Sequence, residues 1–464
     1  MRHVLIALAA ASLSACVSTT VNEAAPQARA GEVAREGRAK NVILFIGDGM
    51  GISTITAARI YAGQKMGQTG EEYVLPFEKF DNVALVKTYN TDAQVPDSAG
   101  TATAIHSGSK TRIGMLGVGP QAMQSDCDAA RRYPLPLLGE EVKERGLALG
   151  IVSTARITHA TPASVYARSA NRDWEADSAL PEGIDLDLCR DIARQLVESD
   201  FDVALGGGTA GFFGADRGGR RNVANADLPS QWATRTGGTV VTTAAGLAAA
   251  PADRPVLGVF SPSHMTYMVD RAADSTEPTL TDMTASALQR LSRDADGYYL
   301  MVESGRIDHG HHAGQAGYAL EEAVEFARAI QYAIDNTDPE ETMILVTADH
   351  SHVFTIAGYP RRGNPILGHV ISPESTDGSA DLAEDGKPYT TLSYANGPGA
   401  VTGERPVPDT GVRARQQSIV PLNSETHGGE DVALYGTGPG AGRVRGVIEQ
   451  NRIYNIIRAA FGWE

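Results

Sequence analysis

Three histidines within four positions follow a strand-like run in the second half of the sequence. Residues 298–302 are apolar and β-prone, and the ten residues 303–312, ESGRIDHGHH, come directly after them. Asp308 and His312 are four positions apart, so a helical turn would place them on one face. A carboxylate and an imidazole held in that way suit a divalent cation that accepts both oxygen and nitrogen, zinc above all. A charged, solvated helix start is the alternative, which three clustered histidines disfavour.

Other segments carry further ligand-type residues. They supply Asp48, Ser98, Arg156, His159, Thr161, Asp349, His350 and His427. Seven of the eleven histidines lie in these segments or in 303–312, a distribution that scattered surface or core histidines would not give. Each motif is weak alone, but together they predict a multinuclear metal site.

Ser98 and Arg156 are the candidates for covalent chemistry on an anion. The small residues of 96–104 predict a turn entering a helix at Ser98, where free N–H groups and the helix dipole favour a phosphate. A serine becomes a good nucleophile when metal coordination lowers its pKa. Arg156 could hold two phosphoryl oxygens with its planar fork, whereas its alternative is a surface salt bridge. This set fits phosphoryl transfer through a phosphoserine, with net retention at phosphorus.

Alternating strands and helices would position these residues. Amphipathic helical patterns separate apolar runs, and the runs themselves lie at 42–46, 149–152, 201–205, 298–302 and 343–347. The pattern predicts an α/β fold, a three-layer sandwich with a central, largely parallel sheet flanked by helices. Because ligands bind at the carboxyl ends of such strands, the polar residues there should converge. Residues 358–420 are rich in Gly, Pro and polar residues, which predicts an irregular, crown-like subdomain inserted into the catalytic domain 41–464.

Composition limits the class of protein. The chain has 464 residues, enough for a large core, and 50 glycines, which favour many tight turns. A net charge of −16 argues against a nucleic-acid binder. Because the negative net charge of the protein repels an anionic substrate, such a substrate would have to be attracted locally, by metal ions or by an arginine in the binding site.

The N-terminus predicts export. Arg2 and His3 precede the apolar run 4–11, and Leu-Ser-Ala-Cys at 13–16 resembles a bacterial lipobox. We expect 1–16 to be a signal peptide, Cys16 to be lipidated, and 17–40 to be a flexible tether. The protein would then be periplasmic or anchored in the outer membrane; an ordinary signal peptide is the alternative.

Export changes the interpretation of the remaining cysteines. Cys127 and Cys189 lie in polar, loop-like surroundings, and a disulfide between them is the natural expectation for an exported protein. Two free thiols remain the alternative.

Five segments together resemble the signature segments of alkaline phosphatase: 45–50, 95–103, 302–312, 347–354 and 425–431. His159 and His309 make the animal-type branch the closer match. The resemblance extends from about residue 41 to the C-terminus and includes that branch's disulfide. It implies a homodimer that hydrolyses many phosphate monoesters, with a preference for alkaline pH.

The resemblance also implies two zinc ions and one magnesium ion per chain. The first zinc would be held by Asp308, His312 and His427. The second would be held by Asp48, Asp349 and His350, joined by Ser98. Magnesium would be held by Asp48, Thr161 and Glu303, with His159 and His309 just outside the ligands. Phe260-Ser261-Pro262 replaces the Phe-Glu-Pro run of the branch's calcium site, so calcium binding is doubtful.

Other enzymes of the same superfamily are the main alternative: a phosphodiesterase, a phosphonate hydrolase or a sulfatase. Cys127 lacks the proline of the sulfatase frame, since Ala129 stands in its place. A non-catalytic protein that binds phosphate or metal is a second class, which the filled set of catalytic positions disfavours.

Overall fold

A computed structural model describes residues 37–463. The predicted signal peptide, Cys16 and most of the predicted tether lie outside the described residues. Within 37–463, no helix combines the length and the apolarity needed to cross a membrane.

The core of the fold is a ten-stranded sheet with the order β15-β2-β14-β8-β1-β7-β3-β4-β6-β5. Its strands are β1 Asn41–Gly47, β2 Asn82–Lys87, β3 Ala148–Arg156, β4 Val203–Gly207, β5 Thr239–Val241, β6 Val256–Val259, β7 Tyr298–Ser304, β8 Thr342–Ala348, β14 Val432–Thr437 and β15 Gly446–Glu449. Only β14 runs antiparallel to its neighbours, β2 and β8. The prediction of an α/β fold with a largely parallel sheet is confirmed.

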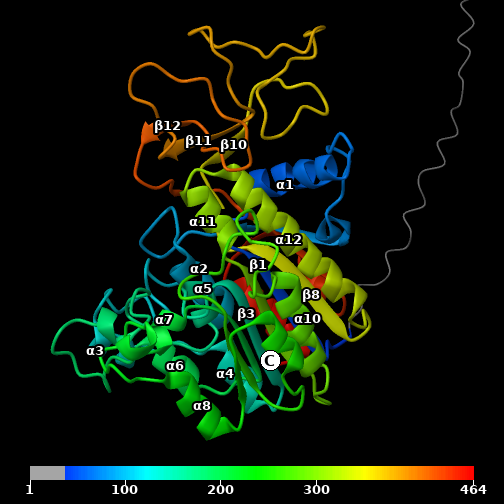
Figure 1. Cartoon of the computed structure of the whole chain (residues 1–464). Helices are drawn as coiled ribbons and strands as arrows, with labels where there is room; N and C mark the ends of the chain where they lie inside the picture. Colours follow the sequence, from blue (N-terminus) through cyan, green and yellow to red (C-terminus); the bar gives the residue numbers. More distant parts are fainter. Residues whose placement is uncertain (1–36, 464) are drawn as a thin grey trace, which may run out of the picture.

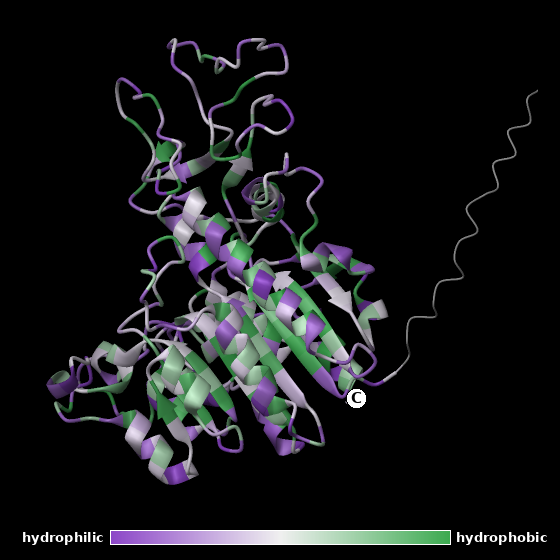
Figure 2. Cartoon of the chain, turned by 45° about the vertical axis from the view of Figure 1, so that its right-hand side comes forward, coloured by the Kyte–Doolittle hydropathy of each residue, from purple (hydrophilic) through white to green (hydrophobic). Residues whose placement is uncertain are grey.

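Helices cover both faces of the sheet (Figure 1). They are α1 Ile52–Lys65, α2 Ser98–Ser107, α3 Cys127–Arg132, α4 Leu138–Glu144, α5 Ala160–Ala163, α6 Ile192–Glu198, α7 Thr209–Phe212, α8 Leu228–Thr236, α9 Ala244–Ala249, α10 Leu280–Leu291, α11 Arg306–His312, α12 Ala316–Asp335 and α13 Arg452–Phe461. Adjacent residues of β3 face opposite layers, since Leu149 contacts α4 at Gly139 and Gly150 lies against Leu291 of α10. The central strands are consequently apolar along both faces, which explains their continuous hydrophobic runs (Figure 2).

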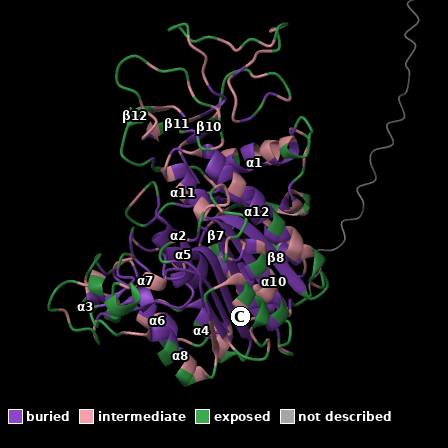
Figure 3. Cartoon of the chain, viewed as in Figure 1, coloured by how far each residue is buried: buried purple, intermediate pink, exposed green. Residues whose placement is uncertain are grey.

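Burial is greatest in the middle of the sheet (Figure 3). Every residue of β1, β7 and β8 is buried. The main hydrophobic core runs through these strands and the helices packed on them. This rigid centre is what fixes the positions of the loops at the strand ends.

A small second sheet stands beyond α11. It consists of β10 Phe354–Ile356, β11 Leu392–Gly397 and β12 Ser418–Pro421 (Figure 1). The segments 358–391 and 398–417 that connect its strands are irregular apart from isolated bridges. Two short strands, β9 Ser351–His352 and β13 His427–Gly428, form a separate pair.

A disulfide joins Cys127, the first residue of α3, to Cys189. Their Cα atoms are 5.7 Å apart. The predicted pairing is confirmed, and it links α3 to a segment 62 residues later in the sequence, just before α6.

Candidate active site

The strand order brings the predicted segments to one edge of the sheet. β8, β1, β7 and β3 are consecutive, parallel neighbours. Gly47 at the end of β1 lies opposite Ser304 of β7 and Ala348 of β8. The loops after these strands, which carry Asp48 and Asp349, therefore meet at the carboxyl edge.

Ser98 is the first residue of α2, as the run of small residues predicts. Asp97 caps the helix by accepting a hydrogen bond from the Gly100 N–H at 3.1 Å. Close contact between the helix and Asn90 leaves no room for a side chain at Gly100. The cap thus fixes the Ser98 hydroxyl at the positive end of the helix, facing the sheet edge.

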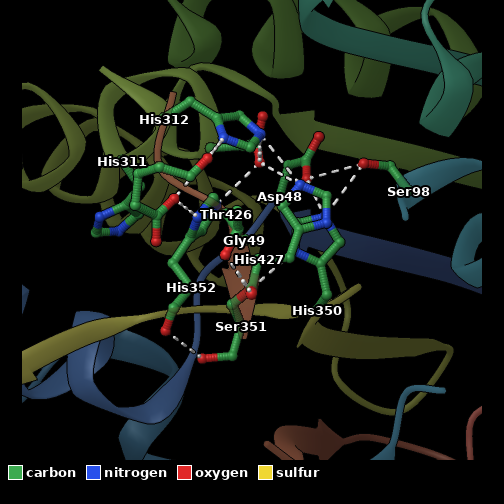
Figure 4. Close-up of polar contacts among 12 residues, drawn as sticks. Asp48, Gly49, Ser98, His311, His312, His350, Ser351, His352, Thr426 and His427 are labelled. Carbon is green, nitrogen blue, oxygen red and sulfur yellow. Dashed lines mark hydrogen bonds and ion pairs between the residues drawn. The ribbon is translucent and has the colours of Figure 1, made fainter. Parts of the chain in front are cut away.

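Ser98 faces Asp48 and His350 (Figure 4). These two residues form a buried cluster with Asp349. Ser98 Oγ lies 3.2 Å from His350 Nε2 and 3.5 Å from Asp48 Oδ1. His350 Nε2 is also 3.3 Å from Asp48 Oδ1 and 3.4 Å from Asp349 Oδ2. Burial, and then repulsion from neighbouring carboxylates, raises the pKa of Asp48 well above its ordinary value. A cation among these atoms would relieve that repulsion.

Asp308, His312 and His427 form a second cluster beside the first. Asp308 Oδ1 is 3.3 Å from His312 Nε2 and 3.5 Å from His427 Nε2. The two Nε2 atoms are 3.1 Å apart. The pairing of β13 with β9 delivers His427 across 115 residues of sequence from His312.

The hydrogen bonds of these two imidazoles fix their tautomers. His312 Nδ1 lies 2.6 Å from the carbonyl oxygen of Glu425, and His427 Nδ1 lies 2.7 Å from that of Pro96. Each Nδ1 must carry the proton to donate to a carbonyl, so each Nε2 presents a lone pair. Two lone pairs and a carboxylate oxygen facing one another form a ligand set for a cation.

A third group lies on the other side of Asp48. Asp48, Glu303 and His159 offer ligand atoms that lie within 4.8 Å of one another. In the described chain Asp48 Oδ2, Glu303 Oε1 and the Thr161 hydroxyl are buried without a hydrogen-bond partner. Buried polar atoms are rarely left unpaired, so these orphaned oxygens fit a hard cation.

His159 and His309 stand next to this group, with ring centroids 5.6 Å apart. Burial lowers the pKa of His159 well below its usual value and that of His309 to about 3. Sequence reasoning missed a third imidazole, His264, whose ring centroid lies 4.0 Å from that of His309. It lies two residues after Phe260-Ser261-Pro262, the stretch that matches the calcium-site run of the family, and this was the available signal.

His352 and Glu425 were also missed as functional residues. His352 Nε2 lies 2.9 Å from Asp308 Oδ1, and its Nδ1 lies 2.6 Å from Glu425 Oε2. Although burial opposes it, the carboxylates of Glu425 and Asp308 raise the pKa of His352 to about 10. His352 lies two positions after the predicted ligand His350, and this proximity was the sequence signal that could have identified it as a site residue. Its contact with Asp308, 44 residues away, could not be read from the sequence.

Two arginines line the pocket, and they differ in their partners. Arg156 Nε and Nη2 contact the buried carboxylate of Glu175 at 2.7 and 2.6 Å, and Nη1 contacts His264. Arg172, which sequence analysis did not select, places Nη1 3.0 Å from Asp97 Oδ2. Asp97 precedes Ser98, so this ion pair holds Arg172 beside the serine.

These side chains surround a cavity of about 280 Å³. The cavity is lined by Ser98, Arg156, His159, Arg172, Asp173, Glu175, Asp308, His309, His312 and His427. A phosphoryl group entering it would meet the serine hydroxyl, the metal-ligand clusters and guanidinium groups together.

Comparison with known proteins agrees with this geometry. Residues 39–462 match the family profile described as alkaline phosphatase. The chain is 45% identical over 441 residues to the tissue-nonspecific alkaline phosphatase of Gallus gallus, covering 89% of this chain and 83% of that protein. It is 43% identical over 448 residues to the corresponding isozyme of Homo sapiens, covering 91% and 83%.

Solved structures show the same fold. The crystal structure of Thermus thermophilus alkaline phosphatase superposes with a TM-score of 0.68 at 25% identity, covering 93% of each chain. That of the Antarctic bacterium TAB5 gives 0.66 at 24% identity, covering 93% of this chain and 100% of that one. The chain belongs to the alkaline phosphatase family.

Proposed function

We propose that this chain hydrolyses phosphate monoesters by a two-step transfer in which Ser98 carries the phosphoryl group. The observation that carries the proposal is the position of the Ser98 hydroxyl. It lies at the N-terminus of α2, 3.2 Å from His350 Nε2, and lines the same cavity as two arginines. The phosphodiesterase, phosphonate hydrolase and sulfatase alternatives are not favoured, given the 43–45% identity to alkaline phosphatases.

The family is metal-dependent, and the residues here fit bound cations. We propose that zinc is held by Asp308, His312 and His427, and a second zinc by Asp48, Asp349 and His350, with Ser98 joining. Magnesium would be held by Asp48, Thr161 and Glu303, whose unpartnered oxygens suit it. When bound, these ions supply Lewis acidity that activates oxygen nucleophiles and stabilises leaving oxygens.

The reaction would proceed in two displacements at phosphorus. Ser98 Oγ attacks, a bond forms between Oγ and phosphorus, and the bond to the ester oxygen breaks. The alcohol leaves with the proton that the Ser98 hydroxyl gives up. A water molecule then attacks phosphorus, the bond to Oγ breaks, Oγ takes a proton from that water, and inorganic phosphate is released. Two inversions give net retention at phosphorus. The dipole of α2 favours the phosphoserine between the two steps.

Arg172 is better placed than Arg156 to hold the transferring group. An arginine has five N–H donors. Nε, Nη1 and Nη2 of Arg156 all have partners, in Glu175, His264 and Ser263. Arg172 uses Nη1 on Asp97 and Nη2 on His159, and its Nε has no hydrogen-bond partner among the described residues. We therefore propose that Arg172 makes the main contact with phosphate oxygens. Arg156, the arginine chosen from the sequence, would contribute positive charge at the cavity wall.

Hydrolysis of p-nitrophenyl phosphate at pH about 9 by wild type and Ser98→Ala tests the proposal. Activity should disappear with EDTA, return with zinc and magnesium, and be largely absent in the variant. Turnover of bis-p-nitrophenyl phosphate or a sulfate ester, but not of the monoester, would favour a superfamily relative. Metal binding without any turnover would support a binding protein.

Export and assembly extend the proposal. We propose that Cys16, outside the described residues, is lipidated and holds the enzyme at the periplasmic side of a membrane. Cys16→Ser should then release activity from the membrane fraction into the soluble periplasm. Homodimerisation, which is typical of the family, can be checked by light scattering of the purified enzyme.

A further inference from the structure

We propose that a pocket beside the disulfide binds small aromatic carboxylates and communicates with the catalytic cavity. The pocket has a volume of about 230 Å³ and is lined in part by residues of α3. Neither the metal-ligand residues nor Ser98 lines it. The proposal therefore concerns a second site, separate from phosphate hydrolysis.

The floor of this disulfide pocket is apolar and firmly held. Trp174, Ala170 and the Cys127–Cys189 disulfide form one small buried hydrophobic cluster, with Leu188 packed against it. All of these residues line the pocket. Trp174 is 5% exposed, so its ring is fixed rather than free in solvent. A flat indole and a disulfide suit a planar, apolar ligand body.

The rim of the pocket is cationic. Three arginines line it, Arg131, Arg168 and Arg190, and no acidic residue does. Arg168 and Arg190 contact Glu140 and Glu198 outside the pocket. Among the contacts of residues 37–463, the Arg131 side chain has neither an ion pair nor a hydrogen bond. Since Arg168 and Arg190 are already paired with carboxylates, Arg131 is the rim charge that remains to hold an anion.

The apolar floor and the cationic rim together define the class of ligand. An apolar, planar body would cover Trp174 and Leu188, and a single carboxylate would reach Arg131. A guanidinium matches a carboxylate with two parallel hydrogen bonds. The cavity volume limits the body to about one aromatic ring, which makes phenylacetate a suitable probe.

One segment of chain separates the disulfide pocket from the catalytic cavity. Ser169, Ala170 and Trp174 line the former, while Arg172, Asp173 and Glu175 line the latter. The segment is tied on both sides, since the Ser125 N–H donates to the Ala170 carbonyl and the Ile192 N–H donates to the Trp174 carbonyl, each at 2.9 Å.

A ligand that contacts Trp174 would therefore change the positions of Arg172 and Glu175, which are close to it in the sequence. Glu175 holds Arg156, and Arg172 is paired with Asp97 next to Ser98. A small shift of Trp174 would move both guanidinium groups relative to the serine. We expect occupancy to change kcat or the inhibition constant of inorganic phosphate without competing with substrate.

Calorimetric titration of the metal-loaded full-length enzyme with phenylacetate tests binding, and it does not depend on turnover. Leu188→Trp fills the pocket and should weaken binding at least about tenfold. Leu186→Trp is the matched control, because Leu186 is exposed and does not line the pocket. Arg131→Ala should weaken binding by about threefold, as expected for one exposed ion pair, whereas the adjacent Arg132→Ala should not. The neutral analogue 2-phenylethanol should bind more weakly than phenylacetate.

Several outcomes would overturn the proposal. Absence of binding at about 10 mM, or equal binding to wild type and Leu188→Trp, would refute the site. Displacement of phenylacetate by inorganic phosphate, with a competitive kinetic pattern, would place the ligand in the catalytic cavity instead. Binding that leaves p-nitrophenyl phosphate hydrolysis unchanged would refute the communication between the pockets. Because calorimetry reports binding directly, an inactive enzyme would refute the proposed function but not this site.

Discussion

A matched pair of substitutions, Arg172→Lys and Arg156→Lys, separates the roles of the two arginines. Each change keeps the positive charge and removes the planar fork. If Arg172 holds the phosphoryl group, its lysine variant loses about one charge-assisted hydrogen bond, worth about 2 kcal/mol. That corresponds to about a 30-fold decrease in kcat/KM. Arg156→Lys should lower kcat/KM by less than about fivefold, because its donors are already directed at Glu175 and His264.

The assay is steady-state hydrolysis of p-nitrophenyl phosphate, together with the inhibition constant of inorganic phosphate. Phosphate affinity should fall in Arg172→Lys roughly in step with kcat/KM, since product and transition state share the phosphoryl oxygens. A thermal melt controls for folding: Arg156→Lys weakens the contact with Glu175 and should show the larger drop in Tm. A large loss of phosphate affinity in Arg156→Lys, with Arg172→Lys nearly unaffected, would refute the assignment.

Three further outcomes are expected. Removing metal with EDTA should lower the Tm, because the imidazole lone pairs and carboxylates that face one another then lose the cation between them. Adding zinc and magnesium should restore the Tm, and an unchanged Tm would contradict the ligand assignment. Gly49→Ala should abolish most activity, since Gly49 has φ +68° and a Cβ there would lie 2.3 Å from His352; near wild-type kcat would contradict it. Burial lowers the pKa of His106 to about 4 in the folded protein. In the unfolded chain its pKa is about 6.5, so as the pH falls below 6.5 the unfolded state binds a proton at His106 before the folded state does. The free energy of unfolding should therefore decrease by up to about 3 kcal/mol between pH 6.5 and 4. In denaturant titrations His106→Gln should show a smaller decrease over this pH range, and an equal decrease in wild type and variant would refute the prediction.

Much of the fold could be predicted from hydrophobic runs alone. Every apolar run identified in the sequence contains or overlaps a parallel strand of the central sheet. Such runs are informative because a strand covered by helices on both faces must be apolar at successive positions. The antiparallel insertion of β14 between β2 and β8 was not predicted, because pairing partners depend on contacts across hundreds of residues.

The limits of sequence reasoning are clearest at Arg172 and His352, neither of which was selected from the sequence. Arg156 ends β3 beside the predicted ligands, so proximity in sequence favoured it as the phosphate contact. Glu175, 19 residues later, folds back and occupies its guanidinium. Arg172 lies in a turn without a recognisable motif, and its ion pair with Asp97 together with its hydrogen bond to His159 places it beside Ser98. Long-range ion pairs of this kind leave no periodic signal in the sequence.

The geometry of the metal-ligand clusters connects this chemistry to the stability of the fold. His312 and His427 direct lone pairs at each other because backbone carbonyls fix their Nδ1 protons, and Asp308 adds a negative charge to the same space. Asp48 and Asp349 are fully buried, and their pKa values are raised by burial together with neighbouring carboxylates. A chain that folds into this arrangement accumulates repulsion that cations remove. Metal binding should therefore contribute to folding free energy as well as to catalysis, and the rigid sheet that positions the clusters makes them selective for cations that accept both oxygen and nitrogen.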